Sequence, residues 1–345
     1  MKIIVDAFGG DHAPLEILKG CADAVKELDI SILLTGRASE IRRVAKEHAI
    51  SLEGMEIADA PDVITMEDHA TDIMKAKKNS SMAEGLRRLA AGEGDAFVSA
   101  GNSGALVTGA TMIVKRIKGI RRVAFAPVLP KGKGCFLLID SGANSDCQPE
   151  MLRQFGVMGS AYMERVMQIP NPRVGLVNVG TESGKGNALM RETFPLLRDS
   201  GLNFVGNIEA REIPADAADV VVADGFTGNI ILKMYEGVAL TLLGKIKEIF
   251  QKSLKNKIAA AVVLKDVKTF KRQMDYNEYG GAPIMGAKKP VFKAHGSAKA
   301  RTFTSALRLT KAYVESDVVS AIAETVAAAK SGSSAQELEK AESES

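Results

Sequence analysis

The most constraining feature of this sequence is a series of short apolar runs, each followed by a loop rich in Gly, Asn, Asp, Ser or Thr. Helix-like segments, with apolar residues three and four positions apart, separate many of the runs. The runs cover residues 2–7, 30–36, 55–60, 95–101, 135–142, 173–180, 202–207 and 219–225. This alternation predicts an α/β fold, a three-layer αβα sandwich whose mostly parallel sheet is covered by helices on both faces.

The loops after five of the runs share the same polar chemistry. They read DAFGGDHAP (6–14), SAGNSGA (99–105), DSGAN (140–144), NVGTESGKGN (178–187) and ADGFTGN (223–229). Because the carboxyl ends of parallel strands lie at one edge of a sheet, where ligands bind in such folds, we expect these loops to converge on one site. The alternative is that such loops are short and contain glycine whatever their function.

One of these loops resembles a nucleotide-binding P-loop but does not match its pattern. The P-loop sequence is G-x-x-x-x-G-K-[ST], in which the last hydroxyl binds Mg²⁺. Here only three residues separate Gly180 from Gly184, and Gly186 stands where the hydroxyl belongs, after Lys185. Successive backbone N–H groups in a glycine loop still form a concavity that binds anions. The loop therefore predicts an anion site without a magnesium nucleotide.

Composition limits the class of protein. The chain has 345 residues, 46% hydrophobic and 25% charged, which suffices for one large globular domain or two smaller lobes. Three cysteines without C-x-x-C spacing indicate neither a disulfide framework nor a zinc site, which favours a reducing cytoplasm. The N-terminus lacks the pattern of a signal peptide. The longest apolar run, 258–264, is far too short to span a bilayer.

Positive charge is concentrated in one segment. The net charge is +3, yet residues 245–272 contain nine basic and two acidic residues, a balance of +7 that leaves about −4 for the rest. This segment is helical in propensity, with Leu, Ile, Phe and Val between its lysines. It could be a core-packing helix pair with a solvated basic face, or an amphipathic arm on an anionic membrane surface. After about residue 331 the Ser/Glu-rich sequence predicts a disordered tail.

The residues give little support for covalent or metal chemistry. No G-x-S-x-G elbow or catalytic-cysteine signature occurs, and the chain lacks the G-x-G-x-x-G fingerprint of dinucleotide binding. His12 and His295 lie in polar, glycine-bearing contexts, but a lone histidine is more often structural. Acidic residues at strand ends, such as Asp6 and Asp224, commonly cap helices. The remaining backbone amides, Asn amides, hydroxyls and the Lys185 cation are groups that hold oxyanions.

Eight motifs occur in the order and context of one bacterial family. They are DAFGGDHAP (6–14), KKNSSM (77–82), SAGNSGAL (99–106), IDSGAN (139–144), GTESGKGN (180–187), DVVVADGFTGNIILK (219–233), GGAPIMG (280–286) and HGSA (295–298). Over residues 1–328 the chain resembles the bacterial phosphate acyltransferases of phospholipid synthesis. It departs from that family at Phe8, Ser103 and Ser183, where the family usually has Met, Thr and an acidic residue.

The resemblance implies an activity, a fold and partners. The activity is transfer of a long-chain acyl group from acyl carrier protein to inorganic phosphate, which gives acyl phosphate for phosphatidic acid and phospholipid synthesis without a cofactor. The fold would be Rossmann-like, similar to isopropylmalate dehydrogenases and phosphotransacetylases, with one catalytic domain over residues 1–330, a protruding basic helical arm at about 240–278, and the disordered tail at 331–345. The protein would be a cytoplasmic homodimer, peripherally associated with the inner membrane face, with the downstream membrane glycerol-3-phosphate acyltransferase as a further candidate partner.

For this reaction the protein must position phosphate, an anionic nucleophile, and stabilise the oxyanion that forms. We assign charge neutralisation to Lys185 and oxyanion donation to Asn229 or a neighbouring amide. The candidate phosphate and substrate ligands are Asp6, Gly9, Gly10, Asp11, His12, Asn102, Ser103, Gly104, Asn144, Gly184, Gly186, Asp224, Gly225, Thr227, Gly228 and His295. The candidate membrane or carrier-protein surface comprises Leu254, Lys255, Lys257, Ile258, Val262, Val263 and Lys265.

Two other functions fit parts of the pattern. An NAD-dependent dehydrogenase could use the same architecture, but the dinucleotide fingerprint is missing. A sensor could bind an anionic metabolite in the glycine loops and reach membranes through the basic segment. Phosphate-dependent loss of the thioester of palmitoyl carrier protein distinguishes the enzyme from both.

Overall fold

The computed structural model describes residues 1–273 and 280–328, with side chains over 1–267 and 280–328. The strands are β1 (Lys2–Asp6), β2 (Ser31–Gly36), β3 (Met55–Asp59), β4 (Ala96–Ser99), β5 (Ala124–Phe125), β6 (Val128–Pro130), β7 (Cys135–Ile139), β8 (Val174–Asn178), β9 (Phe204–Glu209), β10 (Val220–Val222), β11 (Gly281–Met285) and β12 (Val291–Ala294). The labelled helices are α1 (Leu15–Leu28), α2 (Ala38–Glu47), α3 (Ser81–Ala91), α4 (Ser103–Gly109), α5 (Pro149–Arg165), α6 (Ala188–Arg198), α7 (Gly225–Gln251), α8 (Leu254–Gln273) and α9 (Ala300–Glu315), with the short 3₁₀ helices η1 (Ala70–Met74) and η3 (Ala210–Ala215) and the short π-helix η2 (Ala110–Val114). Residues 318–328 are also helical.

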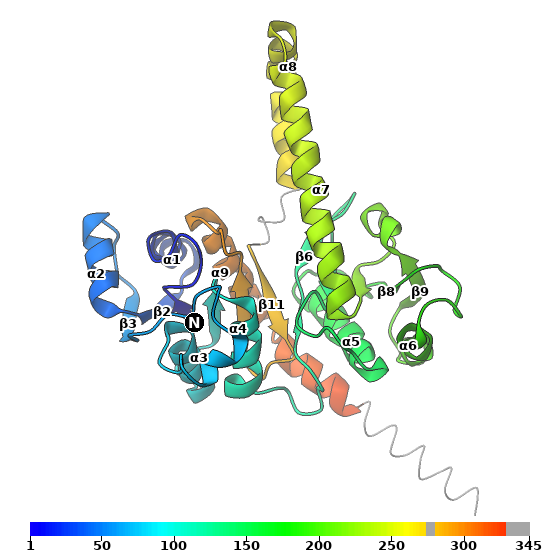
Figure 1. Ribbon diagram of the computed structural model, residues 1–345, viewed down its shortest axis with the longest axis horizontal. Coiled ribbons are helices and arrows are strands. Elements are labelled where there is room, and N and C mark those ends of the chain that lie inside the picture. Colours follow the sequence, from blue (N-terminus) through cyan, green and yellow to red (C-terminus); the bar gives the residue numbers. More distant parts are fainter. Residues whose placement is uncertain (274–279, 329–345) are drawn as a thin grey trace, which may run out of the picture.

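The strands form two sheets, each the centre of one lobe (Figure 1). The first lobe has the order β3-β2-β1-β4-β12-β11-β5, parallel from β3 to β12, with β11 antiparallel to both of its neighbours, β12 and β5. The second lobe has the order β6-β7-β10-β8-β9, in which only β6 runs antiparallel. The predicted α/β class with mostly parallel strands is confirmed. However, the strands divide between two sheets, because the periodicity that reveals a strand does not say which strand it pairs with.

Alternate residues of the central strands face opposite helical layers. In β1, Ile3 and Val5 belong to the cluster that includes α1 and α9, whereas Ile4 packs with α3 and α4. In β10, Val220 and Val222 pack with α5 and Val221 with α7. Since side chains of a strand alternate between faces, runs buried on both sides must be continuously apolar. Each lobe therefore has the expected helix–sheet–helix layering.

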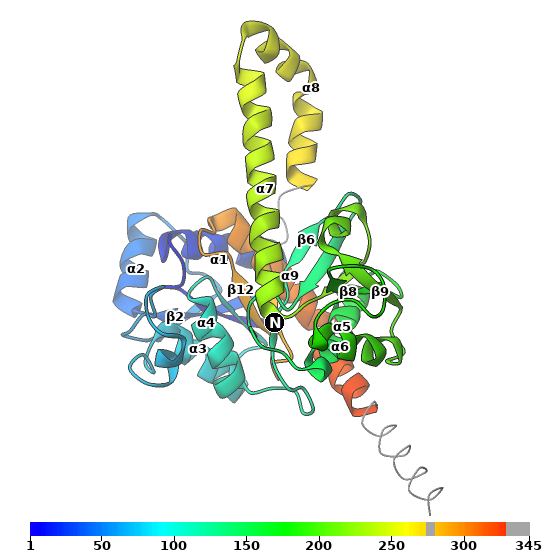
Figure 2. The same ribbon diagram turned by 45° about the vertical axis from the view of Figure 1, so that its right-hand side comes forward.

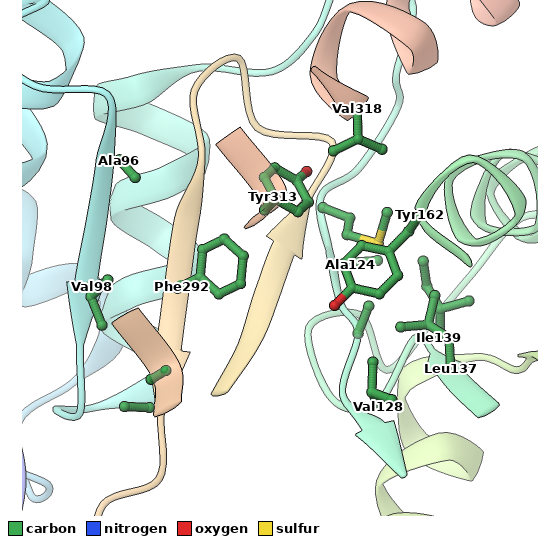
Figure 3. Packing of buried hydrophobic residues seen from close by; sticks show 14 of the residues in the cluster. Ala96, Val98, Ala124, Val128, Leu137, Ile139, Tyr162, Phe292, Tyr313 and Val318 are labelled. Carbon is green, nitrogen blue, oxygen red and sulfur yellow. The ribbon is translucent and has the colours of Figure 1, made fainter. Parts of the chain in front are cut away.

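One hydrophobic cluster extends across both lobes (Figure 3). It contains Phe292 of the first sheet and Ile139 of the second, joined through aromatic side chains of the covering helices. The ring of Tyr313 in α9 lies 5.1 Å from that of Phe292 and 6.0 Å from that of Tyr162 in α5. Such buried aromatic contacts fix the two sheets relative to each other, and so position the loops at their carboxyl ends.

The basic segment forms a helical hairpin that protrudes from the body (Figures 1 and 2). It consists of the outer part of α7 followed by α8, which Ser253 caps through a bond from the Asn256 N–H to its Oγ, 3.2 Å long. We call this hairpin, residues 240–273, the arm. The predicted arm reached residue 278, and residues 274–278 and the tail at 331–345 lie outside the described residues. Within the described ranges, no helix combines the length and apolarity needed to cross a bilayer.

Candidate active site

The first candidate group lies at the carboxyl end of β1. Asp6 is buried there and accepts hydrogen bonds from Ser99 Oγ at 2.7 Å and from the Phe8 N–H at 3.1 Å. Burial raises the pKa of the Asp6 carboxyl, against the opposing effect of these hydrogen bonds. A Cβ on Gly9 would lie only 2.6 Å from the Gly101 nitrogen. Glycine at position 9 thus lets the loops after β1 and β4 touch.

The next loop residues contact the segment after β12. The Asp11 N–H donates to the carbonyl of Gly296 at 2.8 Å. Gly10 has a φ of +103°, and a Cβ there would lie 2.9 Å from the same carbonyl oxygen. His12 is exposed at the start of α1, where its carbonyl accepts from the Glu16 N–H. The loops after β1 and β4, two of the five expected to converge, therefore touch, and the segment after β12, which was not among those five, joins them.

Sequence reasoning missed the most buried cation of this edge, Lys293 of β12. Only 7% of Lys293 is exposed, and its Nζ donates to the carbonyls of Ala100 at 2.9 Å and Ala294 at 2.7 Å. Burial lowers the pKa of this lysine to about 8, although the Asp11 and Asp6 carboxylates oppose the shift. The available signal was a lone lysine in the short β-like run VFKAH, which directly precedes His295.

His295 follows Lys293 at the same edge. Its Nδ1 lies 2.9 Å from Ser297 Oγ. Burial lowers the pKa of the imidazole, Lys293 and Lys233 act in the same direction, and Glu236 and Asp11 oppose them. Lys233 and Glu236 form an ion pair of 3.0 Å on α7. The histidine thus lies between charged groups of both lobes.

A pocket of about 310 Å³ lies between the lobes at these residues. Its polar lining residues are Asp11, Ser103, Lys293, His295, Ser297, Lys233 and Glu236, and its apolar lining residues include Phe125, Pro127, Val128, Leu129 and Leu232. Pockets with apolar walls and a few convergent polar groups are typical of substrate sites. The arrangement suits an apolar chain that ends in an anionic or carbonyl group.

The second lobe contributes the N-terminus of α7. Asp224 caps this helix, accepting from the Thr227 N–H at 2.9 Å and from Thr227 Oγ1 at 2.7 Å. The Gly225 N–H donates to the Asn144 carbonyl at 2.8 Å, and a Cβ on Gly225 would lie 2.5 Å from that oxygen. A Cβ on Gly228 would run into the carbonyl of Asp140. These glycines therefore let the helix start against the 140–144 loop.

Asp140 organises that loop. The carboxylate accepts from the N–H groups of Phe125, Ala143 and Asn144 and from the Asn144 side chain, at 2.7–3.1 Å. Burial raises the pKa of Asp140 against these hydrogen bonds. Asn229 of α7 is exposed. It lies beside the loop, since a Cβ on Gly142 would be 3.6 Å from its Oδ1. Since Phe125 also lines the pocket, the loop links α7 to the pocket wall.

The Lys185 loop follows β8. The side chain of Lys185 is 54% exposed, and its Nζ lies 4.0 Å from a Glu182 oxygen. Gly186 has a φ of +89°, and a Cβ there would run into the Asn178 side chain, whose Nδ2 donates to the Lys185 carbonyl at 3.1 Å. A Cβ on Gly184 would meet open space. Lys185 is not among the residues that line the pocket.

The remaining predicted ligands lie at the start of α4. Asn102 caps this helix by accepting from the Ala105 N–H at 3.0 Å, and its Nδ2 donates to the carbonyls of Thr65 and Asp68. Its side chain therefore has a structural role already, while Ser103 beside it is exposed and lines the pocket. A Cβ on Gly104 would lie 3.1 Å from Ala70. Of the predicted ligands, the structure brings Asp11, Ser103 and His295 into the pocket lining.

Within the described ranges, no three His, Cys, Asp or Glu side chains lie close enough together to hold a metal ion. Beside the carboxylates of Asp11 and Glu236, the pocket is lined by cations, hydroxyls and an imidazole, which can hold an oxyanion.

Comparisons with known proteins agree with this chemistry. The sequence profile of the family described as "Fatty acid synthesis protein" matches residues 1–321. The chain is 44% identical over 322 residues to the phosphate acyltransferase of Thermoanaerobacterium thermosaccharolyticum, covering 93% of this chain and 96% of that protein. It is 46% identical over 323 residues to that of Acetivibrio thermocellus, covering 93% and 95%. Among solved structures, a phosphotransacetylase from Streptococcus pyogenes has the same fold, with a TM-score of 0.59, 16% identity, and coverage of 91% and 94%.

Proposed function

The chain belongs to the phosphate acyltransferase family of lipid biosynthesis, and from this we propose that the pocket between its lobes transfers an acyl group from acyl carrier protein to inorganic phosphate. The pocket itself is the observation that carries the proposal. Its apolar lining suits a long acyl chain, and its polar lining, with Lys293 and His295, suits the thioester carbonyl and phosphate.

The proposed reaction is a direct displacement. A phosphate oxygen forms a bond to the thioester carbonyl carbon, and the carbonyl becomes a tetrahedral oxyanion. When the oxyanion collapses, the carbon–sulfur bond breaks, the carrier leaves as a thiolate that takes up a proton, and acyl phosphate remains. Phosphate is already an anionic nucleophile, so the protein must hold it beside the carbonyl and neutralise charge.

We assign the charge at the reacting centre to Lys293. An ammonium group has three N–H donors, and the carbonyls of Ala100 and Ala294 use two of them. The third is left for a phosphate or carbonyl oxygen in the pocket. In a site with little water, such a fixed charge is worth more than a solvated one.

Lys185 and Asn229 keep separate roles in the proposal. The exposed Lys185 attracts phosphate from solvent toward the second lobe, and Asn229 beside the 140–144 loop donates to an oxyanion. His295, whose pKa is lowered by burial, is neutral at pH 7, so it can accept the proton of the attacking hydrogen phosphate and then pass it to the leaving sulfur.

The direct test uses palmitoyl carrier protein, with and without phosphate. We expect loss of thioester that depends on phosphate and yields one palmitoyl phosphate per thiol released. Thioester-independent reduction of NAD would support a dehydrogenase instead. Tight phosphate binding without turnover would support a sensor.

We further propose that the arm rests on an anionic membrane. Leu254, Ile258 and Val262 recur every four residues on α8 and are 75%, 61% and 80% exposed. The same helix carries Lys255 and Lys257 between these residues, and Val263 and Lys265 after them. Burial of each apolar side chain is worth about 1.5–3 kcal/mol, and each lysine near anionic lipid adds about 1 kcal/mol.

Sedimentation with vesicles of phosphatidylglycerol and phosphatidylcholine tests the arm. The Leu254→Glu/Ile258→Glu/Val262→Glu variant should remain in the supernatant while the wild type sediments. The matched control places three glutamates at the exposed positions Ala91, Ser51 and Met112, away from the arm. Equal sedimentation of wild type and arm variant would refute the membrane role.

A homodimer is the proposed assembly. Phe226, Ile230 and Met234 form a second exposed apolar stripe, on the inner part of α7, and a second copy of the chain would cover it. Light scattering of wild type and of Ile230→Asp measures the mass directly. A wild type that scatters as a monomer at micromolar concentration would refute this assembly.

A further inference from the structure

A second concentration of positive charge lies outside the arm. Between residues 115 and 122 all five charged residues are cations, and all five are exposed: Lys115, Arg116, Lys118, Arg121 and Arg122. The sequence holds no Asp or Glu from residue 96 to residue 139. The segment follows α4 and η2 and lies below the sheets, at the end of the molecule away from the arm (Figure 1).

A second segment of the chain adds to this charge. The exposed Lys288 and Lys289 lie in the turn between β11 and β12, and residues 280–314 also lack acidic residues. The Lys288 N–H donates to the carbonyl of Lys115 at 2.8 Å, and Arg116 forms a β-bridge with Ala287. We call these seven cations the basic patch. Backbone bonds between its two segments hold it together, so it is a fixed surface of the fold.

The basic patch lacks internal compensation. Across the described part of the chain, none of its seven cations has a carboxylate oxygen within 4.0 Å. Arg121 donates to the neutral Gln148 at 2.7 Å, and Glu150 of the adjacent α5 is paired with Arg153 at 2.6 Å. Several other exposed cations of the lobes, such as Arg43 and Arg87, form ion pairs. Uncompensated like charges repel one another, which an acidic partner would relieve.

The basic patch is continuous with the pocket wall. Two residues separate Arg122 from Phe125, which lines the pocket, and this stretch pairs with β11, whose first residues line the same pocket. At about 3.3 Å per residue, the patch lies on the order of 15 Å from the pocket along β11. The carbonyl of Val123 also accepts a bond of 2.8 Å from Asn144 of the loop that links α7 to the pocket.

From this placement we infer that the basic patch is the docking surface for the acidic face of the acyl carrier protein, which leaves the arm free for the membrane. The inference rests on the proposed function, because it names the surface that receives that reaction's acyl donor. When the carrier is bound at the basic patch, its flexible prosthetic group is enough to bring the acyl chain to the pocket. Docking at the end opposite the arm also keeps the carrier clear of the lipid surface.

The experiment compares three charge-reversal variants with equal changes of charge. The patch variant is Lys118→Glu/Arg122→Glu/Lys289→Glu, whose side chains form no hydrogen bond or ion pair with the residues that the structure describes. The arm variant is Lys252→Glu/Lys255→Glu/Lys257→Glu. The control, Lys26→Glu/Arg42→Glu/Lys46→Glu, reverses three exposed cations of α1 and α2. Each is assayed with palmitoyl carrier protein and with palmitoyl pantetheine, the same thioester without the protein, and carrier binding is measured by calorimetry.

We expect the patch variant to raise the KM for palmitoyl carrier protein and the Kd for the carrier at least about tenfold, with an unchanged KM for palmitoyl pantetheine. The arm and control variants should keep the wild-type carrier affinity. An unchanged carrier Kd in the patch variant, an equal loss in the arm variant, or an equal loss with palmitoyl pantetheine would each overturn the inference. If the wild type turned over neither thioester, the proposed function would fail, and the calorimetric Kd would still decide the docking surface.

Discussion

The Nζ of Lys293 donates to the carbonyl of Ala100 at 2.9 Å, which ties the end of β12 to the loop after β4. These two residues are nearly two hundred positions apart in the chain. Their contact holds a buried charge at the mouth of three converging loops, between the carboxylates of Asp6 and Asp11. A buried cation is costly unless it is bonded, so its bonds fix where the remaining donor can act.

We expect Lys293→Met to lower kcat/KM for phosphate by about a hundredfold, since one fixed charge at a developing oxyanion is worth about 3 kcal/mol. Steady-state kinetics at varied phosphate measures this. Lys133→Met, which removes an exposed lysine from the turn between β6 and β7, is the matched control. A Lys293→Met protein that unfolds like wild type and keeps wild-type phosphate kinetics would remove Lys293 from the site.

The lowered pKa of Lys293 predicts opposite effects of pH on activity and stability. Above its folded pKa of about 8 the lysine loses its charge, so kcat/KM should fall on the alkaline side. Between pH 8 and the unfolded pKa near 10.5 the unfolded chain binds more protons, so this group's contribution to stability rises with pH.

A pH–rate profile and urea unfolding at pH 7 to 10 measure the two effects. In Lys293→Arg the side chain stays charged, so the alkaline limb should move upward and the stability difference should disappear. An alkaline limb at the same pH in a folded Lys293→Arg protein would contradict the assignment.

His295 should act as a neutral imidazole at pH 7, because burial lowers its pKa below 6.5. We expect His295→Asn to lower kcat with palmitoyl carrier protein by about a hundredfold, the usual size of a general acid–base contribution. The acid limb of the wild-type profile should lie below pH 6.5. His48→Asn at the end of α2 serves as the control. If kcat with an activated thiophenyl ester, whose leaving group needs no proton, fell equally, proton transfer would not be the role of His295.

The shared edge of parallel strands predicted that the loops after β1 and β4 meet, and the structure brings Asp11 and Ser103 of these loops into the pocket lining. His295 was named as a candidate ligand without a prediction that its segment joins them, and Lys185, which was expected at the same site, is not among the lining residues. Lys293 was missed since β12 is short and pairs with β4, far away in the chain, and no local pattern reveals such a pairing. By contrast, local packing explains why position 186 is a glycine, because any side chain there would run into Asn178. A glycine-rich loop alone therefore does not separate a ligand site from tight packing.

Variants of Lys185 and Lys293 test the two different roles that we propose for these lysines in phosphate binding. Lys185 is exposed, so a charge there attracts phosphate without touching the reacting atoms. We expect Lys185→Ala to raise the KM for phosphate several-fold with little change in kcat, and the effect should shrink in 0.5 M salt because exposed charges are screened. Lys293→Met should lower kcat at any salt concentration. A Lys185→Ala protein with near-wild-type phosphate KM would refute the role given to Lys185.

We expect any substitution of Gly10 to destabilise the fold, both through its backbone conformation and through packing. Its φ of +103° disfavours any side chain, and a Cβ would also lie 2.9 Å from the Gly296 carbonyl oxygen. Gly92, with a φ of +83° and open space around a Cβ, isolates the backbone contribution. We expect Gly92→Ala to cost about 1 kcal/mol and Gly10→Ala about 2–4 kcal/mol in urea unfolding. Because the added methyl group separates the loops that carry Asp11 and His295, Gly10→Ala should also raise the KM for phosphate. Equal losses of stability in the two variants would show that the loops after β1 and β12 yield without cost, and that their contact does not shape the site.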